Sequence, residues 1–163
     1  MILTLKGLMD RQKELDTYIF INRGIESYNE MVEKNIKTAL FVELGELMNE
    51  VPTCFKHWKK HCSDDREKAL EEYVDCLHFS LSLAYHYQVP ISFVYHDYDN
   101  VGKLADVYGI DQLLIDIVTE SDNSRGLHAL FLLGNKLGFS WDEIYCAYNK
   151  KNKINYERQE TNY

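Results

Sequence analysis

The chain has 163 residues, of which 45% are hydrophobic, and is most simply a single domain over residues 1–163. Its formal net charge of −8 argues against non-specific nucleic-acid binding, because such binding depends on basic groups that neutralise phosphates. No apolar run is long enough to cross a bilayer and residues 1–6 lack the basic start of a signal peptide, so we expect no membrane partner and a cytoplasmic location.

Only two prolines and eight glycines interrupt the chain, so long helices are expected. Apolar residues recur at helical spacing in residues 5–20, and residues 35–49 form a second predicted helix. Pro52 ends the latter, because proline has no amide hydrogen to donate. The polar run 63–65 caps a helix predicted over 66–87. The remaining predicted helices cover residues 91–103, 111–120, 124–137 and 140–152.

The start of the last predicted helix is marked by Ser140 with Glu143 three residues later, which is the pattern of a capping box. Residues 150–163 are polar and are predicted to be a closing tail, mobile without ligand and ordered over a bound substrate. Since no segment predicts a strand, the expected fold class is all-α, with long helices packed around one core.

Two pairs of carboxylates lie among apolar neighbours in two of the predicted helices: Glu43 with Glu46, and Glu72 with Asp75. Residues three apart on a helix share one face, so each pair projects as a unit. For either pair alone, a solvated helix face is the simpler interpretation. Four converging carboxylates, however, repel one another unless cations intervene, and Mg²⁺ prefers oxygen ligands. We therefore predict a magnesium site with more than one ion.

This doubled pattern resembles the all-α nucleoside triphosphate pyrophosphatases, whose motif is ExxE followed by ExxD. Three further segments are similar to the dimeric dUTPases, including those of bacteriophages of Gram-positive hosts. They are the opening segment around Gln12, residues 54–59, and the KNxxNxxRQ motif that begins at Lys151. The resemblance covers nearly the whole chain. It implies a homodimer that hydrolyses dUTP to dUMP and pyrophosphate by a metal-activated water.

The resemblance also implies the roles of particular residues. The four acids would hold the metal ions, and of the first pair we favour Glu46 as the base, although spacing alone does not separate a ligand from a base. The predicted substrate-binding residues are Gln12, Asp16, Lys56, Trp58, Lys59, His78, Lys151, Asn152, Asn155, Arg158 and Gln159. Among them, Lys151 and Arg158 are expected to contact phosphate oxygens.

Base recognition is predicted from residues outside the acid pairs. Gln12 offers both a donor and an acceptor to uracil, and Trp58 offers a face for stacking. Asp16 stands where some relatives have Asn, and an ionised carboxylate can only accept hydrogen bonds. For His78 a buried structural role is an equal alternative to contact with the nucleoside.

Two other functions stay open. One is a related pyrophosphatase that acts on dCTP or on several dNTPs. The other is a regulatory protein that binds a repressor, for which residues 91–137, a variable helical region without the motifs above, would supply a surface. A zinc site at Cys54, His57, His61 and Cys62 is not predicted, because all four lie in one short segment that also contains lysines.

Overall fold

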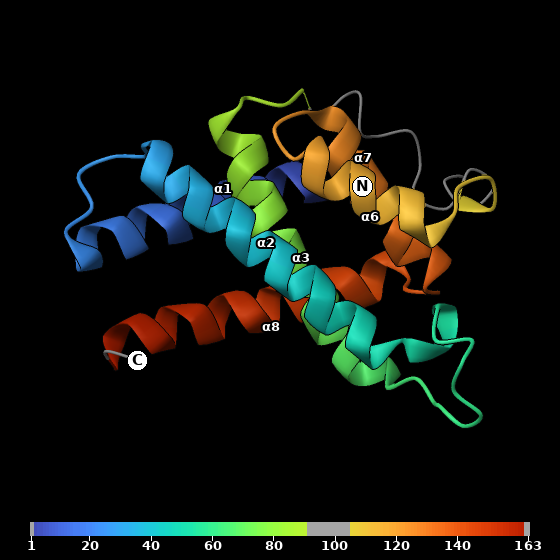
Figure 1. Cartoon of the computed structure of the whole chain (residues 1–163). Helices are drawn as coiled ribbons and strands as arrows, with labels where there is room; N and C mark the ends of the chain where they lie inside the picture. Colours follow the sequence, from blue (N-terminus) through green and yellow to red (C-terminus); the bar gives the residue numbers. More distant parts are fainter. Residues whose placement is uncertain (1, 91–104, 162–163) are drawn as a thin grey trace.

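The computed structural model describes residues 2–90 and 105–161, and within these ranges the protein is all-α, as predicted (Figure 1). The helix predicted over 91–103 lies outside the described residues. None of the described helices is long and apolar enough to span a membrane. The elements are α1 (Ile2–Arg23), α2 (Glu30–Glu50), the short 3₁₀ helix η1 (Pro52–Cys54), α3 (Arg66–His86), α6 (Ile110–Thr119), α7 (Ser124–Lys136) and α8 (Trp141–Glu160).

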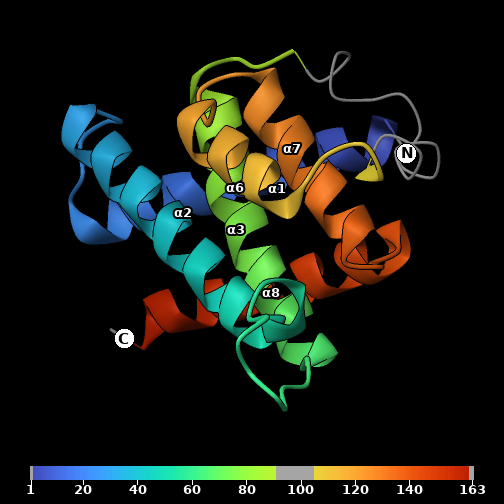
Figure 2. The same cartoon turned by 45° about the vertical axis from the view of Figure 1, so that its right-hand side comes forward.

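Helix α3 is the central element, since it packs against α1, α2, α7 and α8. Figures 1 and 2 show α2 running antiparallel beside it and the α6–α7 hairpin covering one end. A helix with this many neighbours is buried on most of its sides. The Tyr73 hydroxyl of α3 donates to the Leu130 carbonyl of α7 at 3.1 Å. Gly134 permits this approach, because a Cβ there would lie 2.6 Å from the Tyr73 ring.

Helices α1 and α8 pack side by side in parallel. The Tyr148 hydroxyl of α8 lies 3.3 Å from the Leu8 carbonyl oxygen of α1, and further along both helices the rings of Tyr18 and Tyr156 lie 5.1 Å apart. Residue numbers therefore rise in the same direction on both helices. Because both helices also contact α3, residues from opposite ends of the sequence meet over its surface.

Four of the described helices begin at a side-chain cap, namely at Asn29, Asp65, Asn123 and Ser140. Ser140 and Glu143 form the predicted capping box, in which the Glu143 carboxylate accepts from the Ser140 amide at 2.8 Å. Helix α2 begins five residues before the predicted position 35, because the Asn29 side chain accepts from the amides of Met31 and Val32. Asn is among the preferred N-cap residues, so this start was readable from the sequence.

The end of α8 was predicted wrongly. The helix does not stop near residue 152 but continues to Glu160. No glycine or proline interrupts it, and the ammonium group of Lys151 pairs with the Asp75 carboxylate of α3. Residues 150–160, expected as part of a polar closing tail, thus belong to a packed helix. Their closure over a nucleotide stays a prediction.

Candidate functional site

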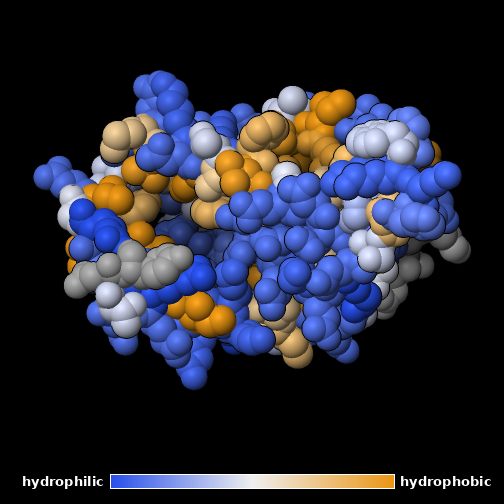
Figure 3. Space-filling model, turned by 60° about the horizontal axis from the view of Figure 1, so that its bottom comes forward, coloured by the Kyte–Doolittle hydropathy of each residue, from blue (hydrophilic) through white to orange (hydrophobic). Residues whose placement is uncertain are grey.

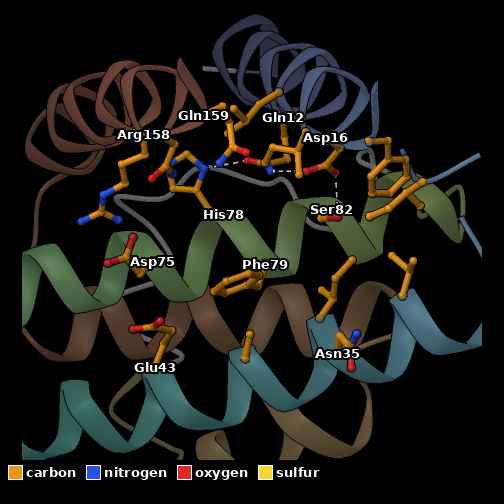
Figure 4. Close-up of a pocket in the computed structure, with 18 residues that line it drawn as sticks. Gln12, Asp16, Asn35, Glu43, Asp75, His78, Phe79, Ser82, Arg158 and Gln159 are labelled. Carbon is orange, nitrogen blue, oxygen red and sulfur yellow. Dashed lines mark hydrogen bonds between the residues drawn. The ribbon is translucent and has the colours of Figure 1, made fainter. Parts of the chain in front are cut away.

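A pocket of about 500 Å³ lies between α1, α2, α3 and α8. Figure 3 shows a hollow with hydrophilic residues in its depth and hydrophobic side chains around it, on the side of the molecule where α8 ends. Each helix lines the pocket with one of its faces. On α3 the lining residues are spaced at i, i+3, i+4 and i+7 from Asp75, and residues at this spacing share one side of a helix. The polar residues of the lining are Gln12, Asp16, Asn35, Glu43, Asp75, His78, Ser82, Asn155, Arg158 and Gln159 (Figure 4).

One end of the pocket is acidic. Carboxylate oxygens of Glu43, Glu46 and Glu72 come within 4.8 Å of one another. Burial, together with repulsion from Asp75 and the other two glutamates, raises the pKa of Glu43 to about 7, and burial likewise raises the pKa of Glu72. Carboxylates that resist ionisation in each other's presence gain from a shared cation. This donor set of oxygens fits a hard divalent ion such as Mg²⁺.

The fourth predicted ligand, Asp75, is engaged differently. Its carboxylate forms an ion pair with Lys151 of α8. Burial raises the pKa of Asp75, while Lys151 and Arg158 oppose that rise. Asp75 and Glu43 both line the pocket and extend toward the same space in Figure 4. The structure therefore gathers three of the four acids into one cluster and holds Asp75 beside it, paired with Lys151.

The acidic end makes stability dependent on pH. A folded-state pKa of about 7 for Glu43, above its ordinary value of 4.5, means that the folded protein binds more protons. The stability this group contributes is present below its unfolded pKa and is lost as the pH rises through 7. We expect the melting temperature in EDTA to fall between pH 6.5 and 8, as measured by differential scanning fluorimetry.

A variant isolates the effect of Glu43 on the melting temperature. His78 acts in the opposite direction in both proteins, because burial lowers its pKa to about 3 and the unfolded chain still releases a proton from this ring near pH 6.5. Glu43→Gln should flatten the slope, since it removes the titrating group. A slope that is the same in this variant would assign the pH effect to another residue.

The opposite end of the pocket is a buried row of polar side chains centred on Gln12, which is 4% exposed. Gln12 Nε2 donates to Asp16 Oδ1 at 2.8 Å, while Gln12 Oε1 accepts from the Tyr148 hydroxyl and from His78 Nδ1, both at 2.7 Å. Two donors fill the two lone pairs of Oε1. Of the donor and the acceptor that Gln12 was predicted to offer the base, only one N–H is therefore left unused within the protein.

His78 presents the complementary group. Its Nδ1 donates to Gln12, so its Nε2 is an acceptor, and that atom is buried without a hydrogen-bond partner among the described residues. The ring stacks on Tyr148 with centroids 4.1 Å apart. Burial lowers the pKa of His78 to about 3, which keeps the ring neutral at physiological pH. A buried, unsatisfied acceptor at a pocket wall is a feature expected of a ligand contact.

Asp16 is held from two sides. Its Oδ1 accepts from Gln12, and its Oδ2 accepts from the Ser82 hydroxyl at 2.6 Å. Burial raises the pKa of Asp16 to about 6, and the bonds from Ser82 and Gln12 limit that rise. Both oxygens thus already bond within the protein, so the most direct effect of Asp16 is on Gln12.

The loop after α2 does not join the pocket. Trp58 is 64% exposed, and its ring meets the edges of Phe55 and His57 at centroid distances of 6.1 and 5.1 Å. Lys56 lies over the Phe55 ring, and Lys59 is exposed. These predicted substrate residues therefore belong neither to the core nor to the pocket lining. The loop follows the C-terminal end of α2, whereas the α1–α2 connection lies at the opposite end of that helix (Figure 1).

The predicted residues of α8 divide by position. Asn155, Arg158 and Gln159 line the pocket, and Lys151 reaches Asp75. Asn152 is half-buried and is not part of the lining. The closing motif thus delivers most of its polar side chains to one site.

Two residues of the polar row, Ser82 and Tyr148, were not predicted from the sequence. Ser82 comes four residues after His78, and Tyr148 comes three residues before Lys151, so each shares a helix face with a predicted residue. That spacing was the available signal. The hydroxyl groups themselves gave no further signal, because a single Ser or Tyr in a helix does not indicate which partner it bonds.

Comparison with known protein families identifies the family of this chain. A family profile described as dUTPase matches residues 4–163. The match covers all or nearly all of every described helix and includes both acid pairs and all the pocket residues named above. No curated protein matches the chain.

Proposed function

Because the chain belongs to the dUTPase family and is a dUTP diphosphatase, we propose that it converts dUTP to dUMP and pyrophosphate in the pocket between α1, α2, α3 and α8. One observation carries this proposal: an acidic end at Glu43 and Asp75 and a buried polar end at Gln12 belong to the same pocket. The acidic end suits a triphosphate that arrives with cations. The buried end suits the base, whose polar edge needs matched partners.

At the acidic end, Glu43, Glu46 and Glu72 are the proposed ligands of Mg²⁺, with Asp75 as a further ligand. Bound Mg²⁺ supplies Lewis-acid stabilisation of phosphate charge and lowers the pKa of the attacking water. Among the glutamates we assign Glu46 as the residue that would serve as the base, since it is the exposed one of the three. On α8, Lys151 and Arg158 are the residues proposed to contact the phosphates.

At the polar end, the remaining N–H of Gln12 is proposed to donate to a carbonyl oxygen of uracil. The free Nε2 of His78 accepts from a donor on the nucleoside, such as the uracil N3–H or the 3′-hydroxyl. Phe79 lines the pocket between the two ends and offers an apolar wall to the sugar. The donor on Gln12 is thereby matched with an acceptor on uracil, and the acceptor on His78 is matched with a donor on the nucleoside.

The proposed function is tested with a panel of dUTP, dCTP, dTTP and UTP, with pyrophosphate release as the readout. We expect kcat/KM for dUTP to exceed that for dCTP by about 10²-fold or more, because a site built around buried polar groups rejects a base that leaves them unpaired. Equal values on dUTP, dCTP and dTTP would refute the preference for dUTP and favour the broader pyrophosphatase. Adding dUDP to the panel reports whether the diphosphate is also cleaved.

For Trp58 we propose stacking on the base, supported by the open face of its ring. Stacking requires the loop to approach a pocket, either its own or that of a partner subunit. Its fluorescence should then change when a non-hydrolysable dUTP analogue binds, and the change should be absent in Trp58→Phe. A signal that persists in this variant would come from Trp141.

A homodimer is proposed as the functional unit. Helices α2 and α6 pack together and expose the apolar side chains of Phe41, Val42, Ile115 and Val118. Large exposed apolar side chains on neighbouring helices are typical of interfaces between proteins. Light scattering should give the mass of two chains, whereas a fully active monomer would contradict the proposal.

The finer assignment to the phage-type branch, and with it a repressor partner, depends on the resemblance of the chain to dUTPases of bacteriophages. Residues 91–137 are the proposed surface for such a partner, and within the described part of them Val107 is 75% exposed. Binding of a purified repressor, with and without dUTP, would test this proposal. The absence of binding in both conditions would contradict it.

A further inference from the structure

The row of polar side chains at the Gln12 end of the pocket is continuous from α3 to α8. It runs from the Ser82 hydroxyl to Asp16, then through Gln12 to His78 and Tyr148, with donor–acceptor distances between 2.6 and 2.8 Å. Gln12, Ser82, His78 and Tyr148 are all buried, and Asp16 is largely so. Dashed lines in Figure 4 follow part of this row.

The row allows only one orientation of the Gln12 amide. If the amide were turned over, Oε1 would face Asp16 Oδ1, and two acceptors would lie about as close as the present bond of 2.8 Å. Asp16 therefore keeps Nε2 on its own side. On the other side, the Tyr148 hydroxyl and the His78 Nδ1–H both point at Oε1. Ser82 acts one step further away, because its bond to Oδ2 holds the Asp16 carboxylate in place.

In this orientation Gln12 can donate to a ligand but cannot accept from it. Both lone pairs of Oε1 are used within the protein, and one N–H of Nε2 is left over. A glutamine free to rotate would serve either a carbonyl or an amino group. Uracil carries a carbonyl oxygen where cytosine carries an amino group, so a fixed donor accepts the first base and opposes the second.

We propose that Ser82, Asp16 and Tyr148 are positioning residues that lock Gln12 as a donor, and that this lock is a determinant of the preference for uracil over cytosine. The inference rests on the proposed function, since it concerns the base that this pocket selects. It assigns roles to two hydroxyl groups that need not touch the substrate. It also explains why an acid at position 16 is compatible with uracil recognition, because the carboxylate acts on Gln12.

Tyr148→Phe is the main test. It removes the hydroxyl but keeps a ring to stack on His78. One lone pair of Gln12 Oε1 then becomes available to an amino group. We expect the ratio of kcat/KM for dUTP to that for dCTP to fall by about tenfold, mainly through KM, which is the size expected for one hydrogen bond. Tyr156→Phe is the matched control, because it removes a hydroxyl from the same helix outside the row.

Ser82→Ala provides a second route to the same effect and involves only a small side chain. Because both variants act on Gln12, the double variant should lose less discrimination than the product of the two single losses. Calorimetric binding of non-hydrolysable dUTP and dCTP analogues reads the discrimination without turnover, and melting temperatures report folding. A wild-type protein that prefers dUTP, with a ratio unchanged within threefold in both variants, overturns the inference. A wild-type protein without that preference overturns the proposed function itself.

Discussion

Glu43→Gln should lower the turnover of dUTP by at least about 100-fold while the protein stays helical. The carboxylate oxygens of Glu43, Glu46 and Glu72 share a space narrow enough for one cation, and an amide cannot replace the charge of the lost carboxylate. Loss of a group that only supports a metal ligand costs 10- to 100-fold, so loss of a ligand should cost at least that much. The same result is expected for Glu46→Gln, Glu72→Gln and Asp75→Asn.

The matched control is Glu71→Gln. Glu71 is the neighbour of Glu72 on α3 but points about 100° away around the helix, and it is exposed. This variant should keep near-native turnover. In the wild-type protein, EDTA should abolish activity and Mg²⁺ should restore it, and Mn²⁺ binding followed by electron paramagnetic resonance should weaken in Glu43→Gln. Full activity in the presence of chelator would contradict a metal-dependent reaction.

The second large effect is expected at the α8 side of the pocket. Arg158→Gln should lower kcat/KM for dUTP by about 100-fold, since the planar guanidinium can donate two hydrogen bonds to one phosphate and an amide cannot replace its charge. Lys151→Met should have an effect of similar direction, because it removes a cation next to Asp75. Steady-state kinetics on purified variants measure both.

Lys153→Met is the control for charge on α8. Lys153 belongs to the same helix, but its side chain is 80% exposed and pairs only weakly with Glu157 at 3.8 Å. It should leave kcat/KM unchanged, so a loss equal to that of Arg158→Gln would indicate general charge attraction. Truncation after Asn149 is a poorer test. It would also remove Tyr156 from its contact with α1, and it should therefore lower stability as well as activity.

The fold was largely predictable because its local determinants are strong. Pro52 and the Ser140–Glu143 box mark helix boundaries by backbone chemistry that does not depend on the rest of the fold. The extension of α8 beyond residue 152, by contrast, does not follow from such local signals. Residues 150–160 are polar, so periodicity gave no apolar stripe, and the helix is instead held by contacts such as Lys151 with Asp75 that join distant segments.

The site was predictable as a set of residues but not as a set of bonds. The spacing of the acid pairs and the resemblance identified Glu43 and Gln12, which the structure places in one pocket. The sequence could not show that Gln12 Oε1 already accepts two hydrogen bonds within the protein, because the donors Tyr148 and His78 come from two other helices. Nor could it show that Trp58 is exposed on a loop outside the pocket.

The parallel packing of α1 and α8 has a kinetic consequence. Gln12 and Tyr148 are 136 residues apart, whereas α6 and α7 are joined by a short connection. Closing so large a loop costs entropy before any contact compensates for it, so such contacts form late in folding. During refolding, helical signal should therefore recover before ligand binding does. A refolding intermediate would then be helical before it is able to bind the nucleotide.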